Sequence, residues 1–382
     1  MPKKVAKTIL SSKMKILIIA GEISSDIYGA QLARALSSKA QPPEVYAIGG
    51  PHLKAVATKF LYQVSGQHAI GIYEIFKQKK FFKKFFKLLP QILEKEKFTC
   101  AVIIDFPYYH FKIAHILRQY QIPITTFITP NFWIWQDQKK ALKLVRYSTN
   151  IITIFPQEYA FYKQFTNQVF YFGHPLLNLL KPMPPKTPTT YKVITLFPGS
   201  RKQEIEYLLP KMLETALYLT KQDIPYKFYL AVSDPVFLPQ IQALLDRQNL
   251  NIELWTKDIH DLYHISDFGI CATGTVSLEA ILYKTPVAVL GAVSFLTYFL
   301  AKYILKLNIK FVALPNIVEG QKIVPEYTQA KIQPALIAQE IRDFFQDPSA
   351  QTRFLTQADH IKQALSQNHN VFQEISNLLL SS

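Results

Sequence analysis

The chain has 382 residues, with 43 lysines and arginines against 27 aspartates and glutamates, so its formal net charge at pH 7 is +16. This length suffices for two domains, and the charge predicts an anionic partner: a membrane surface, a nucleic acid or a phosphorylated ligand. The two cysteines lie in the apolar runs TCAVIIDF and FGICATGT, which excludes a disulfide framework and a zinc site built on cysteine pairs and is typical of a reducing compartment.

The first half of the chain alternates short β-branched runs with longer amphipathic segments. Residues 1–13 are a basic extension, and the run KILIIAG that follows is too short for the core of a signal peptide. We interpret this run as the first strand of a series that ends at VFYFGH. A parallel sheet with crossover helices has this pattern, so we expect an N-terminal Rossmann-like domain over 14–180.

The predicted helix FKQKKFFKKFFKLLPQ, residues 76–91, contains six lysines and no acidic residue. At about 100° per residue its phenylalanines gather on one face and its lysines on the other. Two interpretations stay open: a helix packed on its own domain with a solvated lysine face, or a helix lying on an anionic membrane. Nucleic acid is disfavoured, because single-strand platforms place aromatic residues on sheets or in grooves.

A change of composition divides the chain. Residues 181–190, KPMPPKTPTT, hold four prolines among polar residues and predict an interdomain linker. The alternation restarts at YKVITLFPG, which predicts a second Rossmann-like domain over 191–355 and a C-terminal helix over 356–382 that packs back on the first domain. The longest apolar stretch, residues 286–301, is too short to span a bilayer.

The predicted fold is α/β, with two doubly wound Rossmann-like domains facing each other across a cleft. Ligands of such sheets bind at the carboxyl ends of the strands. In the second domain, LFPGSRKQEI follows a strand and opens a helix. Gly199 permits a tight turn, Ser200 can cap the helix, and Arg201 offers a forked cation to a phosphate.

A second turn of this kind is CATGTVSLEA. Thr273, Gly274 and Thr275 stand at the start of a helix, and Glu279, about one turn inside, can bond sugar hydroxyls. Neither turn is a Walker A loop. If each turn is considered singly, helix capping is enough to explain it. Two such turns in one domain favour a nucleotide diphosphate.

Three stretches of the first domain that carry polar residues also follow strands. GEISSDIYGA lacks the GxGxxG pattern, and its acids Glu22 and Asp26 suit hydroxyl recognition or a structural capping pair. Asp105 in IIDFPYYH is either a general base or a carboxylate that caps its own loop. For His174 a structural role is favoured, and the other histidines show no metal-site spacing.

The chain from about Lys15 to Gln329 resembles lipid-A-disaccharide synthases, which are membrane-associated bacterial glycosyltransferases. Ten stretches match motifs of that family in the same order: GEISSDIYGA, IGGPHL, AIGIYEIF, IDFPYYHFKIA, TPNFWIW, FGHPLLN, LFPGSRKQEI, ATGTVSLEA, LTYFLAK and LPNIVEGQKIVPE.

The resemblance implies a GT-B glycosyltransferase fold and an inverting transfer that needs no metal or other cofactor. UDP-2,3-diacylglucosamine would donate its sugar to 2,3-diacylglucosamine 1-phosphate, giving a β-1,6-linked lipid A disaccharide 1-phosphate and UDP. The implied partners are these two lipids and an anionic membrane surface, without nucleic acid. The implied location is cytoplasmic, peripheral on the inner face of the inner membrane of a Gram-negative bacterium, with the acceptor and the membrane on the side of the first domain.

The resemblance also implies roles for individual residues. Asp105 matches the essential aspartate of the family and is the candidate base. The residues expected to bind the UDP-sugar are Gly199, Ser200, Arg201, Thr273, Gly274, Thr275, Glu279 and Asn316. Further candidate site residues are Glu22, Asp26, His174, Trp133 and Glu319. The implied lipid substrates favour the membrane interpretation of the basic helix, with contact through Phe81, Phe82, Phe85, Phe86, Lys80 and Lys84.

The chain departs from the family motifs at several positions. Ser25 replaces a glycine, and Tyr108 and His110 replace an aspartate and an asparagine. Gly291 and Ala292 stand where the family has Tyr-Arg, which removes a cation near the presumed phosphate region. These departures motivate two alternatives: a UDP-sugar transferase or epimerase on another cell-envelope precursor, and a non-catalytic nucleotide- or lipid-binding relative.

Overall fold

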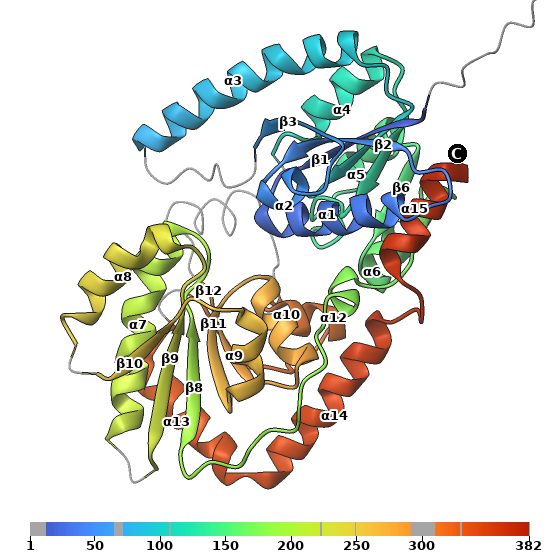
Figure 1. Cartoon of the computed structure of the whole chain (residues 1–382). Coiled ribbons are helices and arrows are strands. Elements are labelled where there is room, and N and C mark those ends of the chain that lie inside the picture. The colour runs from blue at the N-terminus through green and yellow to red at the C-terminus, as the bar shows by residue number, and fades with distance from the viewer. Residues whose placement is uncertain are drawn as a thin grey trace, which may run out of the picture. The chain divides into compact units, whose positions relative to one another are not determined.

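The computed structural model of the chain describes residues 13–64, 72–106, 108–221, 224–248, 250–291, 310–328 and 331–381, with the backbone alone for 72–79 (Figure 1). The chain forms two compact units. The N-terminal domain comprises Met1–Pro175 with Asn368–Ser382, and the C-terminal domain comprises Leu176–Gln367. The expected boundary at 355 therefore falls inside a helix of the C-terminal domain.

The N-terminal domain is built on a parallel sheet whose strand order, within the described residues, is β3-β2-β1-β4-β5-β6-β7. The strands are β1 (Lys15–Ala20), β2 (Glu44–Gly49), β3 (Lys59–Gln63), β4 (Cys100–Ile104), β5 (Ile124–Phe127), β6 (Asn150–Thr153) and β7 (Val169–Tyr171). The inner strands β1, β4 and β5 are buried, as expected for strands covered on both faces. The order reverses between β1 and β4, which makes this pair the topological switch point.

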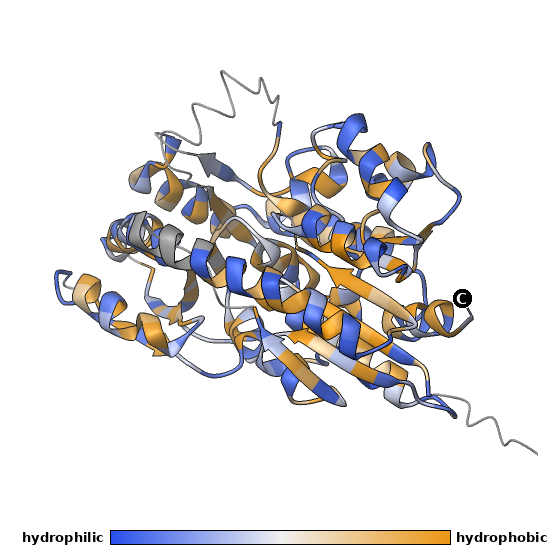
Figure 2. Ribbon diagram, turned by 90° about the horizontal axis from the view of Figure 1, so that it is seen from above, coloured by the Kyte–Doolittle hydropathy of each residue, from blue (hydrophilic) through white to orange (hydrophobic). Residues whose placement is uncertain are grey.

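Helices cover this sheet, and Figure 2 shows hydrophilic and hydrophobic residues alternating along them, as expected for helices with one buried face. They are α1 (Ile23–Ser37), α2 (Pro51–Lys54), α3 (Ile72–Lys95), α4 (His110–Gln119), α5 (Gln138–Tyr147), α6 (Pro156–Lys163) and α15 (Val371–Ser381). The C-terminal helix α15 packs on α1, where the rings of Tyr28 and Phe372 lie 6.4 Å apart and Lys39 Nζ donates to Gln373 Oε1 at 2.9 Å. The last helix of the chain thus belongs to the N-terminal domain.

Helix α3 packs one face onto the core of the N-terminal domain. Phe85 is fully buried at 0% exposure and stacks on Tyr62 of β3 at 5.6 Å, and Phe82 is 6% exposed. Phe81 and Phe86 are partly buried against the same core. The expected membrane contact through all four phenylalanines is therefore corrected: Phe82 and Phe85 are core residues, and of the six expected contacts only Lys80 and Lys84 are exposed.

The C-terminal domain repeats this architecture. Its parallel sheet has the order β10-β9-β8-β11-β12-β13 within the described residues, so the switch point lies between β8 and β11. The strands are β8 (Lys192–Phe197), β9 (Tyr226–Ala231), β10 (Ile252–Trp255), β11 (Phe268–Ala272), β12 (Val287–Gly291) and β13 (Glu326–Thr328). The helices are α7 (Lys202–Thr220), α8 (Leu238–Leu245), α9 (Ile259–Ile265), α10 (Thr275–Leu282), α12 (Leu314–Glu319), α13 (Pro334–Gln346) and α14 (Pro348–Leu365).

The proline-rich segment 181–190 has no regular secondary structure. It is nevertheless fastened to the C-terminal domain at two points. The Lys181 amide donates to Tyr283 Oη at 2.7 Å, and Lys186 Nζ pairs with Asp267 Oδ1 at 2.7 Å. The segment is thus a strap along one domain rather than a spacer with both ends free.

Candidate functional site

Asp105 lies directly after β4, at the switch point of the N-terminal sheet. The chain after β1 runs beside it, because the Gly21 amide donates to Ile104 O at 3.3 Å. The Asp105 amide in turn donates to Phe127 O at 3.2 Å. The sheet therefore holds this carboxylate at the edge where ligands of doubly wound sheets bind.

The backbone at this edge is strained at two neighbouring positions. Asp105 has φ of 40°, and Ile128, directly after β5, has φ of 63°. Aspartate tolerates the left-handed region, whereas for the β-branched isoleucine it is an outlier that costs about 1–3 kcal/mol. Backbone strain of this size persists only where the surrounding contacts hold the residue in place, and strained residues cluster at functional sites. Two such residues on adjacent strands support a functional role for this edge.

Glu158, near the start of α6, holds the loop that follows Ile128. Its buried carboxylate accepts hydrogen bonds from the Thr129 amide at 3.2 Å, the Thr129 hydroxyl at 2.6 Å and the Ile154 amide at 2.8 Å. Burial raises the pKa of Glu158 to about 7, although these hydrogen bonds oppose the shift. Glu158 is not among the site residues predicted from the sequence. The signal was the helix start FPQE, which places a glutamate at the third helical position.

Asp26 has a capping role in this structure. Its buried carboxylate accepts from the amides of Gly50, His52 and Leu53 at 2.6, 2.8 and 3.2 Å, which are the free donors at the start of α2. Of the two interpretations of the acids in GEISSDIYGA, these bonds favour the structural capping pair for Asp26.

Glu22 stands at the N-cap of α1. Ser25, in the place of the motif glycine, accepts from the Glu22 amide at 2.7 Å and donates to the Glu22 carbonyl at 2.8 Å. The departure from the family motif therefore closes the first turn of the helix.

Trp133 and His174 come together on a shared aromatic ring. The Phe155 ring lies 5.5 Å from Trp133 and 5.0 Å from His174, measured between centroids. The three residues follow β5, β6 and β7, so they form a cluster at the carboxyl ends of successive strands. Burial lowers the pKa of His174 to about 3, which keeps the imidazole neutral at pH 7. This placement fits the structural role favoured for His174.

The two departures near Asp105 have different environments. His110 is buried, with its Nε2 at 3.3 Å from Thr126 Oγ1, which itself lies 2.7 Å from Ser148 Oγ. Burial lowers the pKa of His110 to about 4. Tyr108 is 90% exposed. His110 therefore fills a polar position of the core, while Tyr108 faces solvent.

In the C-terminal domain, the turn after β8 is occupied by a carboxylate. Glu204 Oε2 accepts from the amides of Ser200 and Arg201 at 3.1 and 3.2 Å, and Glu204 Oε1 accepts from Arg201 Nη1 at 3.0 Å. Gly199 has φ of 103°, and a Cβ there would lie 2.2 Å from Glu204 Oε2. Arg201, not Ser200, is the N-cap of α7. The donors expected to hold a phosphate do bind an anion, and here the anion is the protein's own glutamate.

The second turn lies after β11, the other strand of the switch point. The Thr273 amide donates to Leu290 O at 3.0 Å, and Gly274 caps α10 with φ of 143°. No described atom lies within 4 Å of where a Gly274 Cβ would be, and Thr275 is exposed. The two turns singled out in the sequence thus sit on the two adjacent strands where a ligand is expected.

Glu279 is a half-buried residue with a defined partner. Tyr263 Oη donates to Glu279 Oε2 at 2.8 Å, and burial raises the pKa of Glu279. Tyr263 is itself fixed by ring contacts with Phe197 at 5.2 Å and Tyr283 at 5.4 Å. The glutamate is therefore oriented by the core rather than free in solvent, which suits an acceptor that bonds hydroxyl groups.

Asn316 has a role that the sequence did not suggest. Its amide nitrogen donates to Val324 O at 3.0 Å and Glu326 Oε2 at 3.1 Å, and its oxygen accepts from the amides of Ile323 and Val324 at 2.7 and 3.0 Å. These four bonds use the whole amide, and the residue is fully buried. Asn316 therefore fastens α12 to the segment before β13, which corrects its expected role as a nucleotide contact.

Glu319, at the end of α12, contacts α14. Both of its carboxylate oxygens lie 3.1 Å from Nδ1 of His360. Its side chain is only 9% exposed, whereas that of His360 is 66% exposed. This pair links two helices of the C-terminal domain.

Gly291, at the end of β12, stands in a narrow space beside the second turn. A Cβ there would lie 3.1 Å from the Thr273 Cγ2 and 3.3 Å from the Thr328 Cγ2. Glycine therefore lets the second turn approach β12 closely. Its neighbour Ala292, the stretch LTYFLAK and the side chains of AIGIYEIF lie outside the described residues.

The described residues contain neither a metal-binding cluster nor a membrane-spanning helix. Within the ranges that the structure describes, no three His, Cys, Asp or Glu side chains gather as a metal site. A mechanism without metal stays a prediction. Among the described residues, no helix has the length and apolar character needed to cross a bilayer.

Comparison with known proteins assigns the family. The sequence model of the lipid-A-disaccharide synthetase family matches residues 16–378. The chain belongs to this family. A relative named lipid-A-disaccharide synthase, from Trichlorobacter lovleyi, is 29% identical over 360 residues, which cover 92% of this chain and 93% of the relative. These matches confirm the predicted family. They also confirm glycosyl transfer as the class of reaction and lipid A disaccharide synthesis as the function.

Solved structures with the same fold confirm the predicted fold class. A putative UDP-N-acetylglucosamine 2-epimerase from Listeria monocytogenes superposes with a TM-score of 0.61 at 13% identity, covering 97% of this chain and 95% of the epimerase. The calicheamicin glycosyltransferase CalG4 superposes with a TM-score of 0.60 at 12% identity, covering 97% and 98%. This member of the synthetase family thus has the α/β architecture of GT-B glycosyltransferases. At such low identity the likeness concerns the fold alone, so the epimerase neighbour does not support the epimerase alternative.

Proposed function

We propose that the chain transfers the sugar of UDP-2,3-diacylglucosamine to 2,3-diacylglucosamine 1-phosphate, forming a β-1,6-linked disaccharide 1-phosphate and UDP. Family membership supports the reaction. The observation that carries the assignment of the site is the position of Asp105, which stands at the switch point of its sheet in a left-handed conformation.

In the proposed step, the Asp105 carboxylate takes the proton of the acceptor's 6-hydroxyl group. The acceptor oxygen then forms a bond to C1 of the donor sugar while the bond between C1 and the UDP oxygen breaks, so the configuration at C1 inverts. The leaving electron pair stays on the diphosphate of UDP, and positive groups that bind this diphosphate favour the transition state. No metal is assigned to this step.

The two turns of the C-terminal domain are proposed to bind the nucleotide. Arg201 and the amides of the first turn would hold the diphosphate, and Glu279 would accept from the ribose hydroxyls. Because Glu204 accepts from the same amides, its carboxylate has to leave the turn when the phosphate enters. The turn beginning at Thr273 lies on the neighbouring strand and offers further amide donors.

Replacing Gly199 by alanine is expected to weaken UDP binding at least about tenfold, because φ of 103° strains any L residue and the turn would relax away from the geometry that directs its amides at the diphosphate. Isothermal titration calorimetry measures the change. Gly320→Ala is the matched control, since Gly320 has φ of 68° with no described atom within 4 Å of the added Cβ. Wild-type affinity in the Gly199 variant would contradict the placement of the diphosphate.

We also propose that the protein works on the inner face of the inner membrane. Both substrates carry acyl chains, and an enzyme with a net charge of +16 is attracted to anionic lipids. The exposed lysines of α3 fit this location, whereas Phe82 and Phe85 are needed in the core. Flotation with phosphatidylglycerol vesicles tests the attraction.

The deciding experiment is mass spectrometry of the lipids formed by the purified chain from the two proposed substrates. The expected product is the disaccharide 1-phosphate, formed only when both substrates are present and formed equally well in EDTA. UDP binding without any product would favour the non-catalytic alternative. A product that requires a different acceptor would favour the other transferase alternative.

A further inference from the structure

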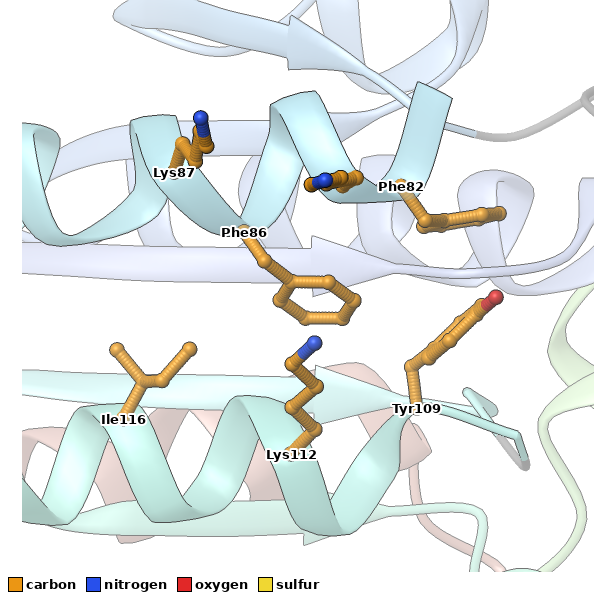
Figure 3. A pocket seen from close by; sticks show the side chains of 7 residues that line it. Phe82, Phe86, Lys87, Tyr109, Lys112 and Ile116 are labelled. Carbon is orange, nitrogen blue, oxygen red and sulfur yellow. The ribbon is translucent and has the colours of Figure 1, made fainter. Parts of the chain in front are cut away.

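A groove runs between α3 and α4 on the surface of the N-terminal domain (Figure 3). Its volume of about 360 Å³ lies in the range of small-molecule sites. Seven residues line it: Phe82, Lys83, Phe86, Lys87, Tyr109, Lys112 and Ile116. None of these lining residues is acidic, so the groove combines apolar and aromatic side chains with three lysines.

The floor of the groove is a packed aromatic cluster. The Tyr109 ring lies 4.2 Å from the Phe82 ring and 5.3 Å from the Phe86 ring. Phe82 and Ile116 are buried below, while Phe86 and Tyr109 are partly exposed. Because the core of the domain holds these rings from beneath, the floor is preformed and offers apolar surface along the two helices.

The border of the groove consists of three lysines on two helices. Lys83 and Lys87 are exposed one turn apart on α3, and Lys112 is exposed on α4 with its Nζ 3.9 Å from the centre of the Phe86 ring. Figure 3 shows Lys112 reaching from α4 toward Phe86 of α3. In the part of the chain that the structure describes, none of the three ammonium groups forms an ion pair with a carboxylate. The border is therefore available to an anion.

We propose that this groove binds one membrane phospholipid, with the start of an acyl chain on the aromatic floor and the phosphate between Lys83, Lys87 and Lys112. An apolar floor directly beside a cluster of cations matches a molecule with an apolar body and an anionic head. A nucleic acid fits less well, since bases stack on open aromatic faces and the Lys112 ammonium covers the face of Phe86. This inference rests on the proposed membrane location, which it makes specific to one groove, and it involves neither Asp105 nor the UDP turns.

The test titrates the full chain with dihexanoyl phosphatidylglycerol, kept below its critical micelle concentration, in a calorimeter. The variant K83Q/K87Q/K112Q is expected to bind at least about tenfold more weakly than the wild type. The control K80Q/K84Q/K95Q removes the same charge from exposed positions of α3 outside the groove, and it is expected to change affinity by less than about threefold. Equal losses in both variants would overturn the proposal in favour of diffuse charge attraction.

Two further comparisons use the unmodified chain. Affinity is expected to rise from dibutanoyl to dihexanoyl to dioctanoyl phosphatidylglycerol, because a longer chain covers more of the floor. An affinity independent of chain length, or binding of inorganic phosphate or of a short single-stranded RNA that equals that of the lipid, would overturn the proposal. UDP binding by both lysine variants should match the wild type, so a failure here is distinguishable from a failure of the proposed transfer.

Discussion

Replacing Asp105 by asparagine is expected to lower kcat by at least about a hundredfold while UDP binds with unchanged affinity. General bases contribute about 10²- to 10⁴-fold to rate, and asparagine cannot take the proton of the acceptor hydroxyl. Asparagine tolerates the left-handed region almost as well as aspartate, so φ of 40° is retained. Alanine would add backbone strain and confuse a chemical loss with a conformational one.

The measurement is turnover at saturating substrates, followed by UDP release, with a UDP titration beside it. Asp26→Asn serves as the matched control, because Asp26 is an aspartate of the same domain that accepts three backbone hydrogen bonds. It is expected to lower the melting temperature and leave the kcat of the folded fraction nearly unchanged. A wild-type kcat in the Asp105 variant would disprove the assignment of the base.

The second large effect is expected at Phe85, whose replacement by alanine should reduce the free energy of unfolding of the N-terminal domain by about 3–5 kcal/mol. Phe85 is fully buried, stacks on Tyr62 at 5.6 Å and belongs to a buried core cluster of this domain. Removing the ring leaves a cavity that its neighbours fill only in part. Urea denaturation followed by circular dichroism gives the difference.

Tyr108→Ala is the control for Phe85, since Tyr108 is 90% exposed and its replacement should change stability by less than about 0.5 kcal/mol. If Phe85→Ala kept wild-type stability and instead lost vesicle binding, Phe85 would be a membrane contact after all. The contrast separates the two interpretations that the sequence of the basic helix left open.

Much of the fold follows from local patterns in the sequence. Alternating β-branched and amphipathic runs predict parallel strands with crossover helices, and the proline-rich segment 181–190 predicts where the two series separate. The positions of Asp105 and of the turns at Gly199 and Thr273 were also predictable. Each follows directly after a strand, and carboxyl ends of adjacent parallel strands meet at one edge of a sheet.

Other features depend on contacts between distant segments and have no local signal. The amphipathic pattern of α3 shows that one face is covered, but not that Tyr62 of β3 covers it rather than a membrane. The motif around Asn316 does not reveal that Ile323 and Val324 turn back to bond its amide. Glu158 shows a helix start in the sequence, yet its bond to Thr129 depends on tertiary structure.

The carboxylate of Glu204 in the first turn has a consequence for the end of the catalytic cycle. A group tethered three and four residues from its two donors competes at a high effective concentration, so it closes over the amides as soon as a bound diphosphate begins to leave. Both amides of the empty turn then have an acceptor, which lowers the free energy of the nucleotide-free state. If UDP binds as proposed, this internal ligand weakens product retention and speeds the release step, which limits turnover in many enzymes.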